Sequence, residues 1–280
     1  MPGLVLEGGT FRPIFSAGVM DALLDENIMF PYCIGVSAGI TDGFSYASRQ
    51  KERNLQILQR YRNDKRYLGA GNLLTDKSIF GVKFVFEEIP NELIPFDWDT
   101  FAQYDGTFRV GVTNAHTGQA EYLDGKQLDA KNTMVKATCA IPLVFPEVQL
   151  NGNVYYDGGI CDPIPVHKAQ ADGCEKLLIV LTRPEGYVKG ESKSNKAAAK
   201  VLRKKYPNLV EPLLTRHIAY NETVQYCEAL EREGKAIILR PAGEGIIDSF
   251  EKDVKRIETS YQYGYDLCQQ RMEEIRALFV

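Results

Sequence analysis

The chain is short of the residues from which metal sites and disulfide frameworks are built. In 280 residues it has only three histidines, at positions 116, 167 and 217, and its six cysteines are widely scattered without a C-x-x-C pair. Scattered cysteines argue against a disulfide scaffold and against a structural zinc site. The sequence therefore predicts a protein with neither.

Long apolar runs and an excess of positive charge are also missing. The longest clean apolar runs, such as LLIVL at 177–181, are far too short to cross a bilayer. The opening MPGLVLEGGT lacks the basic segment of a secretory signal. The formal net charge is −4, and no zinc-finger or RNP-like motif occurs, which argues against nucleic acid as a partner. We therefore expect a soluble, cytoplasmic protein.

Short apolar runs bounded by glycine are present near the start of the chain. GLVLEGG at 3–9 is followed by apolar residues at helical spacing over 14–28, and YCIGVS at 32–37 is followed by a helix start of small residues. Each unit is typical of a strand, a glycine loop and a helix. Two consecutive units predict parallel strands joined by crossover helices.

The middle of the chain alternates between further strands and helices. We expect helices and loops over 51–105, a β-hairpin over 107–125 and a short strand pair that ends in a turn at 151–159. KLLIVLTRP at 176–184 and KAIILRP at 235–241 are continuous apolar runs, typical of buried parallel strands.

The C-terminal part is expected to be mostly helical. The stretch 209–234 predicts a long helix that ends at Gly234. Further apolar residues recur at helical intervals and predict a face that covers the sheet: Phe250, Val254, Ile257, Tyr261, Cys268, Met272, Ile275 and Phe279. We expect a single α/β domain over 1–280, with a motif-bearing core at about 3–182 and a helical extension with a last strand at about 183–280.

One serine lies between two glycines in GVSAG at 35–39. This matches the G-x-S-x-G nucleophile elbow, in which a serine occupies a sharp, strained turn from strand to helix. Gly35 and Gly39 would remove the side-chain clashes of such a turn and leave the Ser37 hydroxyl near a helix N-terminus. The alternative is a turn serine that caps the helix.

An ester-cleaving serine also needs hydrogen-bond donors for the oxyanion that develops during the reaction. The glycine loop EGGTFRP at 7–13 follows the first strand and precedes a helix. If the first two strands are neighbours, the amides of Gly8, Gly9 and Thr10 can face Ser37, and Arg12 adds positive charge. A phosphate-binding loop is the competing interpretation, but neither G-x-G-x-x-G nor the P-loop pattern is present.

The same serine needs a base, and Asp157 is the candidate. It is followed by Gly158 and Gly159, which let the backbone turn tightly and keep the carboxylate approachable. The alternative is a plain D-G turn. Because an unperturbed aspartate has a pKa of about 3.9, burial would have to make Asp157 a better base at neutral pH.

The three sites together resemble the patatin-like phospholipase family, whose pattern is G-G-G-x-[RK]-G, then G-x-S-x-G, then D-G-[GA]. Here the motifs occur in that order as GGTFRP at 8–13, GVSAG at 35–39 and DGG at 157–159. The similarity covers about residues 3–182 and includes the stretch 135–166 around the aspartate. It implies a three-layer α/β/α sandwich with a mostly parallel central sheet.

The resemblance also implies a function. Ser37 and Asp157 would form a Ser-Asp dyad that hydrolyses phospholipids or other acyl lipids, with the loop at 8–12 as the oxyanion hole and without a metal or other cofactor. Two positions depart from the family pattern, because Thr10 replaces the third glycine and Pro13 replaces the last. The alternative is therefore a catalytically weakened homologue that binds a lipid or a partner.

Three further hypotheses concern other residues. His167 or His217 could act as the base of a Ser-His-Asp triad, since the order serine, aspartate, histidine is available. The lysine-rich stretch 189–205 could contact anionic headgroups at a membrane surface, although most such runs are solvated faces. The aromatic segment 80–101, with Phe84, Phe86, Phe96 and Trp98, could line an acyl groove or belong to the core.

Overall fold

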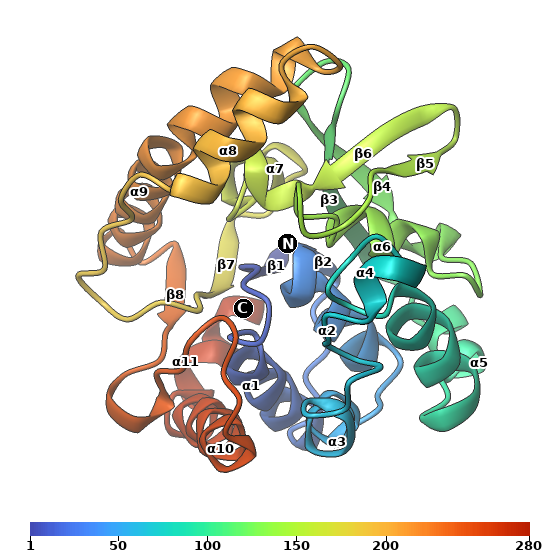
Figure 1. Ribbon diagram of the computed structural model, residues 1–280. Helices are drawn as coiled ribbons and strands as arrows, with labels where there is room; N and C mark the ends of the chain where they lie inside the picture. The colour runs from blue at the N-terminus through green and yellow to red at the C-terminus, as the bar shows by residue number, and fades with distance from the viewer.

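A computed structural model describes all residues from 1 to 280. The chain forms an eight-stranded mixed sheet with helices on both faces, as Figure 1 shows. The strands are β1 (Pro2–Leu6), β2 (Tyr32–Val36), β3 (Thr107–Asn114), β4 (Ala120–Asp124), β5 (Val148–Leu150), β6 (Asn153–Asp157), β7 (Lys176–Val180) and β8 (Ala236–Leu239).

Hydrogen bonding links the strands in the order β5-β6-β3-β2-β1-β7-β8, and β4 pairs with β3. The pairs among β1, β2, β3, β7 and β8 are parallel, whereas β4, β5 and β6 join through antiparallel pairs. The predicted hairpin and strand pair are confirmed, and so is the mostly parallel α/β sheet.

The helices separate into two layers around this sheet. They are α1 (Ile14–Asp25), α2 (Ser37–Ala47), α3 (Arg53–Tyr61), α4 (Asn72–Thr75), α5 (Trp98–Ala102), α6 (Thr133–Thr138), α7 (Val166–Ala171), α8 (Lys193–Leu202), α9 (Val210–Arg232), α10 (Val254–Gln270) and α11 (Met272–Arg276), with a π-helical segment at Phe84–Leu93. No helix is both long and apolar enough to cross a bilayer.

Alternation along the strands explains the layers. Leu4 and Leu6 of β1 face a core cluster with α1, α2 and α11, whereas Val5 between them faces a second cluster with α7 and α9. Strands β7 and β8 alternate in the same way. Because successive strand side chains point to opposite faces, both faces of the central strands are buried. The fold is a three-layer sandwich, as expected.

The C-terminal segment differs in part from its prediction. Helix α10 packs against α1, and the apolar side chains that reach the core beneath the sheet come from its end and from α11: Cys268, Met272 and Ile275. Phe250 is 43% exposed, so its assignment to the buried face is wrong, whereas Phe279, although 42% exposed, packs its ring against the buried Phe30. Phe250 precedes α10 in a loop, where helical periodicity does not apply.

Candidate active site

The register of β3 brings the predicted nucleophile and base together. Val36, the last residue of β2, pairs with Gly111, and Asp157, the last residue of β6, pairs with Val112. Strand β4 occupies the opposite edge of β3 over the same residues, so β2 and β6 lie end to end along one edge. Ser37 follows Val36 directly and therefore meets Asp157 at this junction.

Ser37 occupies a strained turn between β2 and α2. Its φ of 54° is in the left-handed region, which non-glycine residues rarely adopt. A Cβ at Gly39 would overlap the carbonyl oxygen of Glu7, so only glycine fits there. The Ser37 side chain does not cap α2, whose N-cap is Val36. The turn has the form of a nucleophile elbow and not of a serine cap.

A buried threonine holds this turn in place through two hydrogen bonds. The Ser37 amide donates a hydrogen bond to the Thr138 hydroxyl at 2.8 Å, and that hydroxyl donates to the carbonyl oxygen of Gly111 at 2.6 Å. Thr138 lies at the end of α6 and is fully buried. Thr138 lies in the stretch 135–166 that resembles the family, but no motif gave it a role, since 100 residues separate it from the turn that it supports.

The glycine loop lies against Ser37. A Cβ added at Gly8 would be 2.9 Å from the Cβ of Ser37, so the backbone approaches the serine as closely as glycine allows. The amides of Gly8, Gly9 and Thr10 make no hydrogen bond within the protein. These donors are therefore available to an anion beside the serine.

The two departures from the family pattern have clear structural outcomes. Thr10 adopts a φ of 60°, the conformation that glycine would take more easily, so its amide remains in the loop at a cost in strain of about 1–3 kcal/mol. Pro13 sits at the N-cap of α1, where a backbone N–H has no helical partner. Neither residue prevents the loop from forming.

The carboxylate of Asp157 is buried beside a cation. Burial raises its pKa above the usual range, while a hydrogen bond from Ser37, the positive charge of Arg216 and the Gly159 amide act in the opposite direction. The Gly159 amide donates to Oδ1 of Asp157 at 2.8 Å. Arg216, on α9, donates to the Gly159 carbonyl oxygen. The D-G turn thus holds a buried carboxylate whose proton affinity is raised.

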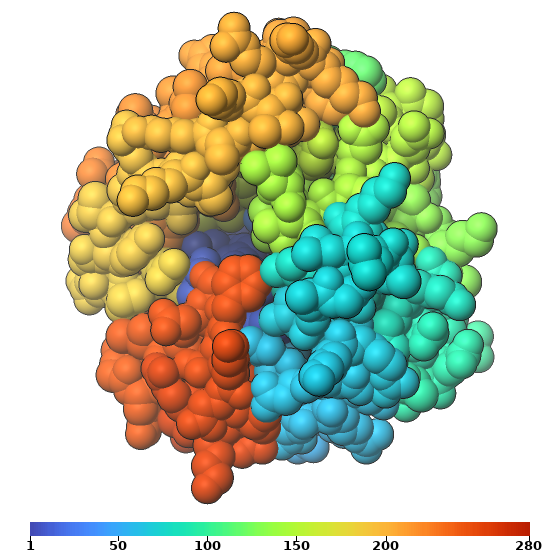
Figure 2. All heavy atoms as spheres, viewed as in Figure 1, coloured from blue at the N-terminus to red at the C-terminus, as the bar shows by residue number.

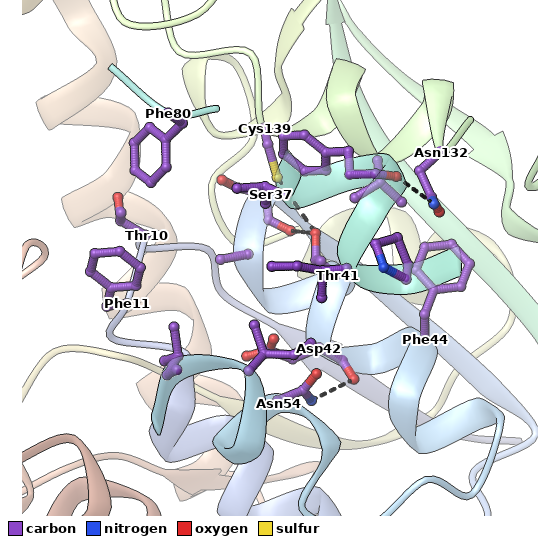
Figure 3. Close-up of a pocket in the computed structure, with 18 of the residues that line it drawn as sticks. Thr10, Phe11, Ser37, Thr41, Asp42, Phe44, Asn54, Phe80, Asn132 and Cys139 are labelled. Atoms are coloured by element: carbon purple, nitrogen blue, oxygen red, sulfur yellow. Dashed lines mark hydrogen bonds between the residues drawn. The ribbon is translucent and has the colours of Figure 1, made fainter. Parts of the chain in front are cut away.

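Two pockets meet at Ser37, and both are lined by Thr10 and Ile141 as well. The first has a volume of about 150 Å³ and is mainly apolar. Figure 3 shows Phe11, Phe80 and Phe44 around it, with Ser37 and Cys139 at its upper edge. Asp42 is one of several polar residues on its wall, and burial raises the pKa of this carboxyl to about 8.

The second pocket is larger, at about 470 Å³, and most of its lining residues are polar, charged or glycine, so we call it the polar pocket. In Figure 2 the N-terminal atoms, coloured blue, lie at the bottom of a central hollow between the yellow and red-orange segments. The charged residues that line this second pocket are Glu7, Arg12, Asp157, Arg183, Lys189 and Arg216. Burial and the neighbouring cations Arg216, Arg12 and Arg183 lower the pKa of Lys189 to about 7. The cations come from widely separated parts of the chain, and only Arg12 was predicted as part of the site.

The aromatic segment divides between its two predicted roles. Phe86 and Phe96 are buried and also line the apolar pocket. Phe84 is buried in the core without lining the pocket, and Trp98 is partly buried and does not line it either. Histidine lines neither pocket: His167 is exposed on α7 and stacks on Tyr226. No cluster of three or more His, Cys, Asp or Glu side chains is arranged to hold a metal ion.

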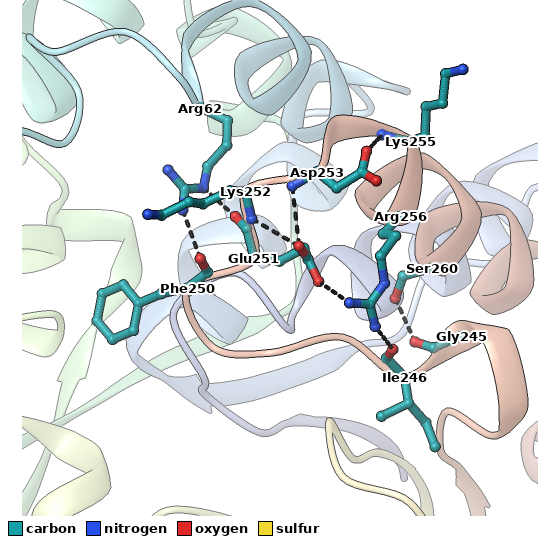
Figure 4. Close-up of polar contacts among 10 residues, drawn as sticks. All are labelled: Arg62, Gly245, Ile246, Phe250, Glu251, Lys252, Asp253, Lys255, Arg256 and Ser260. Carbon is teal, nitrogen blue, oxygen red and sulfur yellow. Dashed lines mark hydrogen bonds and ion pairs between the residues drawn. The ribbon is translucent and has the colours of Figure 1, made fainter.

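A loop from the C-terminal part braces the glycine loop. The Phe11 amide donates to the carbonyl oxygen of Ser249 at 3.2 Å, and the Arg12 guanidinium donates to the Ser249 hydroxyl. Figure 4 shows how the chain after Ser249 is held: Arg62 donates to the carbonyl oxygen of Glu251, whose carboxylate is 2.8 Å from Arg256. Residues distant from the motifs therefore fix the donors beside Ser37.

Comparisons with known proteins find similar sequences and a similar fold. A family model described as Patatin-like phospholipase matches residues 4–169, more than half of the chain, and one described as Domain of unknown function (DUF6363) matches 206–280. The Uncharacterized protein YjjU of Escherichia coli (strain K12) is 27% identical over 186 residues, which are 65% of this chain and 52% of that protein.

Among solved structures, VipD from Legionella pneumophila has a similar fold. The TM-score is 0.53 at 13% sequence identity, over 97% of this chain and 66% of that chain. The chain thus spans about half the length of the curated relative that it matches and about two thirds of VipD.

Proposed function

Because the chain belongs to the patatin-like phospholipase family, we propose that it is a serine lipid acyl hydrolase that cleaves acyl esters of phospholipids or related lipids. The observation that carries the proposal is the junction on β3, where the strained Ser37 turn meets the buried carboxylate of Asp157. The glycine loop beside Ser37 supports it, since its free amides suit an oxyanion.

The reaction would proceed in two steps. The Ser37 hydroxyl oxygen attacks the acyl carbon while Asp157 takes its proton, and the amides of Gly8, Gly9 and Thr10 donate to the oxyanion. The alcohol part then leaves with the proton from Asp157, which gives an acyl-enzyme. Water attacks this acyl group, Asp157 again accepts a proton, and the Ser37 oxygen leaves and recovers its proton.

The environment of Asp157 supports its role as base. A carboxylate with an ordinary pKa is a weak base at neutral pH, whereas burial raises the pKa of this one. The apolar pocket beside Ser37 would take the acyl chain, because its apolar walls offer the contacts that methylene groups gain on leaving water.

Covalent labelling tests the proposal directly. Purified protein is treated with a fluorophosphonate probe, and mass spectrometry locates the modified residue. We expect a single adduct on Ser37, and we expect Ser37→Ala and Asp157→Asn each to lose hydrolysis of p-nitrophenyl butyrate while their circular dichroism is unchanged. His217→Ala is the matched control and should retain activity.

If the probe fails to react, the same experiment supports the alternative, in which the protein is a catalytically weakened homologue that binds a lipid or a partner. The strain at Thr10 is the observation that favours it, since a β-branched residue occupies a left-handed position in the donor loop. A Thr10→Gly, Pro13→Gly variant that gains labelling would then locate the defect in this loop. Full activity of Ser37→Ala or of Asp157→Asn would refute the dyad.

Contact with a membrane surface is a separate part of the proposal. Lys193, Lys196 and Lys200 are exposed on α8, whose residues Ser194, Asn195 and Ala198 line the polar pocket. Such residues attract anionic headgroups. Lys189 differs from them, because it lines that pocket.

A further inference from the structure

The pocket on the polar side of Ser37 owes its charge to residues beyond the matched patatin segment. Arg183 and Lys189 lie in the stretch that joins β7 to α8, and Arg216 lies on α9. All three follow residue 169, where the match to the family model ends. Together with Arg12 of the glycine loop, they surround the space next to the ester-cleaving position.

These cations form no close ion pair, although Arg216 lies near Asp157 and Arg12 lies near Glu7. None of the four forms a salt bridge, although fourteen such pairs occur elsewhere in the protein. The buried Nε of Arg183 has no hydrogen-bond partner. The Lys189 ammonium lies 4.4 Å from the ring centre of Tyr220 and makes no hydrogen bond. Burying unpaired charges is costly, so the cluster is built for an anion that is absent from the protein itself.

We propose that this cationic pocket binds a phosphate group on the alcohol part of the substrate, so that the preferred substrate is an acyl ester with a phosphate monoester headgroup. The proposal rests on the acyl hydrolase function proposed above. With the acyl chain in the apolar pocket and the ester at Ser37, the alcohol part must extend to the other side of the serine, where the polar pocket lies.

The charge balance of the pocket selects among headgroups. Four cations against two carboxylates leave an excess of positive charge, which a phosphate monoester dianion neutralises. A choline or ethanolamine headgroup would instead bring its own cation into the cluster. The volume of about 470 Å³ is within the usual range for small-ligand sites, about 300–1,000 Å³. The N-terminus of α8, with Ser192 and Ser194 on the pocket wall, adds favourable polarity for an anion.

Matched substrates test the selectivity. We compare kcat/KM for 1-octanoylglycerol 3-phosphate, 1-octanoylglycerol and 1-octanoylglycerophosphocholine, which share the acyl chain. The phosphate monoester should exceed both others by at least about tenfold, given about 1.5–3 kcal/mol for a charge-assisted hydrogen bond. In Lys189→Met the ratio of phosphate to neutral substrate should fall about tenfold. Equal rates on all three substrates, or an unchanged ratio in this variant, would overturn the proposal.

Two further variants guard the result. Arg183→Met removes a second cation of the pocket and should lower the same ratio if Lys189→Met fails to fold. Lys235→Met removes an exposed lysine at the amino end of β8, whereas the pocket lies beyond the carboxyl ends of the parallel strands, and it should leave both rates unchanged. If the wild-type protein neither hydrolyses p-nitrophenyl butyrate nor reacts with the fluorophosphonate probe, the acyl hydrolase function is refuted. That result would not bear on the phosphate pocket.

A binding measurement tests the pocket without turnover. Titration calorimetry of Ser37→Ala with 1-octanoylglycerol 3-phosphate should show binding that Lys189→Met, made in the same background, weakens about tenfold. Inorganic phosphate is titrated in parallel and should bind far more weakly. If inorganic phosphate binds as tightly as the lipid, the pocket is a site for free phosphate and the substrate assignment fails.

Discussion

The two pockets that meet at Ser37 are built from different parts of the chain. The apolar pocket is lined by residues between Thr10 and Phe145, within the matched patatin segment. The polar pocket shares Thr10, Ser37 and Ile141 with it, but takes three of its four cations from positions beyond 169. The proposed chemistry and acyl binding thus fall within the family segment, whereas the proposed charge selection depends mainly on the remainder of the chain.

Both pockets contain titratable groups that burial shifts toward their neutral forms, among them Asp42 and Lys189. Burial raises the pKa of Asp42 in the apolar pocket to about 8 and lowers the pKa of Lys189 in the polar pocket to about 7. A bound anion would restore the charge of Lys189, but an acyl chain offers nothing to stabilise the charge of Asp42. Under the proposed assignments, the same physical effect would favour anion binding on one side and keep the other side uncharged.

Filling the apolar pocket should have the largest effect. Ile57 lines this pocket, and Ile57→Trp would displace about three methylene groups of a long acyl chain, a loss of about 60-fold in kcat/KM at about 0.8 kcal/mol each. Rates on p-nitrophenyl esters from butyrate to laurate measure this. Butyrate should be affected least. Ile218→Trp, on the exposed face of α9, is the control, and equal losses at all chain lengths would show that the acyl chain lies elsewhere.

Charge on the outer face of α8 should matter for membranes and not for the cationic pocket. We expect the triple variant Lys193→Glu, Lys196→Glu, Lys200→Glu to bind anionic vesicles on the order of tenfold more weakly. Vesicle co-sedimentation measures the loss, with zwitterionic vesicles as the control. The selectivity for phosphate over neutral substrate should persist in solution. Unchanged vesicle binding would remove the proposed contact.

The pH dependence of hydrolysis should depend on the charge of Arg216 next to the proposed base, Asp157. Asp157 must be deprotonated to act, so activity rises with pH through its raised pKa. Arg216 lowers that pKa, and Arg216→Met should therefore move the acid limb of the kcat/KM profile to higher pH. Arg232→Met, at the exposed end of the same helix, should leave the limb in place. A limb that moves to lower pH would contradict the assignment of Asp157.

The smallest effect is expected for stability at Asp42. In the unfolded chain this carboxyl ionises near pH 3.8, whereas in the folded protein it keeps its proton to about pH 8. Stability contributed by the protonated form is therefore lost as pH rises between these values. Asp42→Asn should melt about 2–4 °C above the wild type at pH 8 and by less at pH 5. Asp105→Asn, at an exposed position, should show no such difference, and a constant gain at both pH values would refute the buried carboxyl.

Local patterns in the sequence were sufficient for the sheet and for the motifs. Glycine-bounded apolar runs located β1 and β2, and continuous runs located β7 and β8, because backbone conformation and burial are encoded within a few neighbouring residues. The elbow at Ser37 could be recognised for the same reason. The exposed Phe250 shows the limit of periodicity as a predictor, because the pattern of apolar residues does not reveal at which residue a helix begins, and α10 begins only after Phe250.

The sequence by itself determined the α/β fold class, the strained serine turn and the family. Only the tertiary structure decided that β3 joins Ser37 to Asp157, that Thr138 supports the turn, and that Arg183, Lys189 and Arg216 converge beside them. The physical reason is that a cation far along the chain has no local signature. Its role depends on which carboxylates and cavities the packed sheet and helices place around it, and that arrangement exists only after folding.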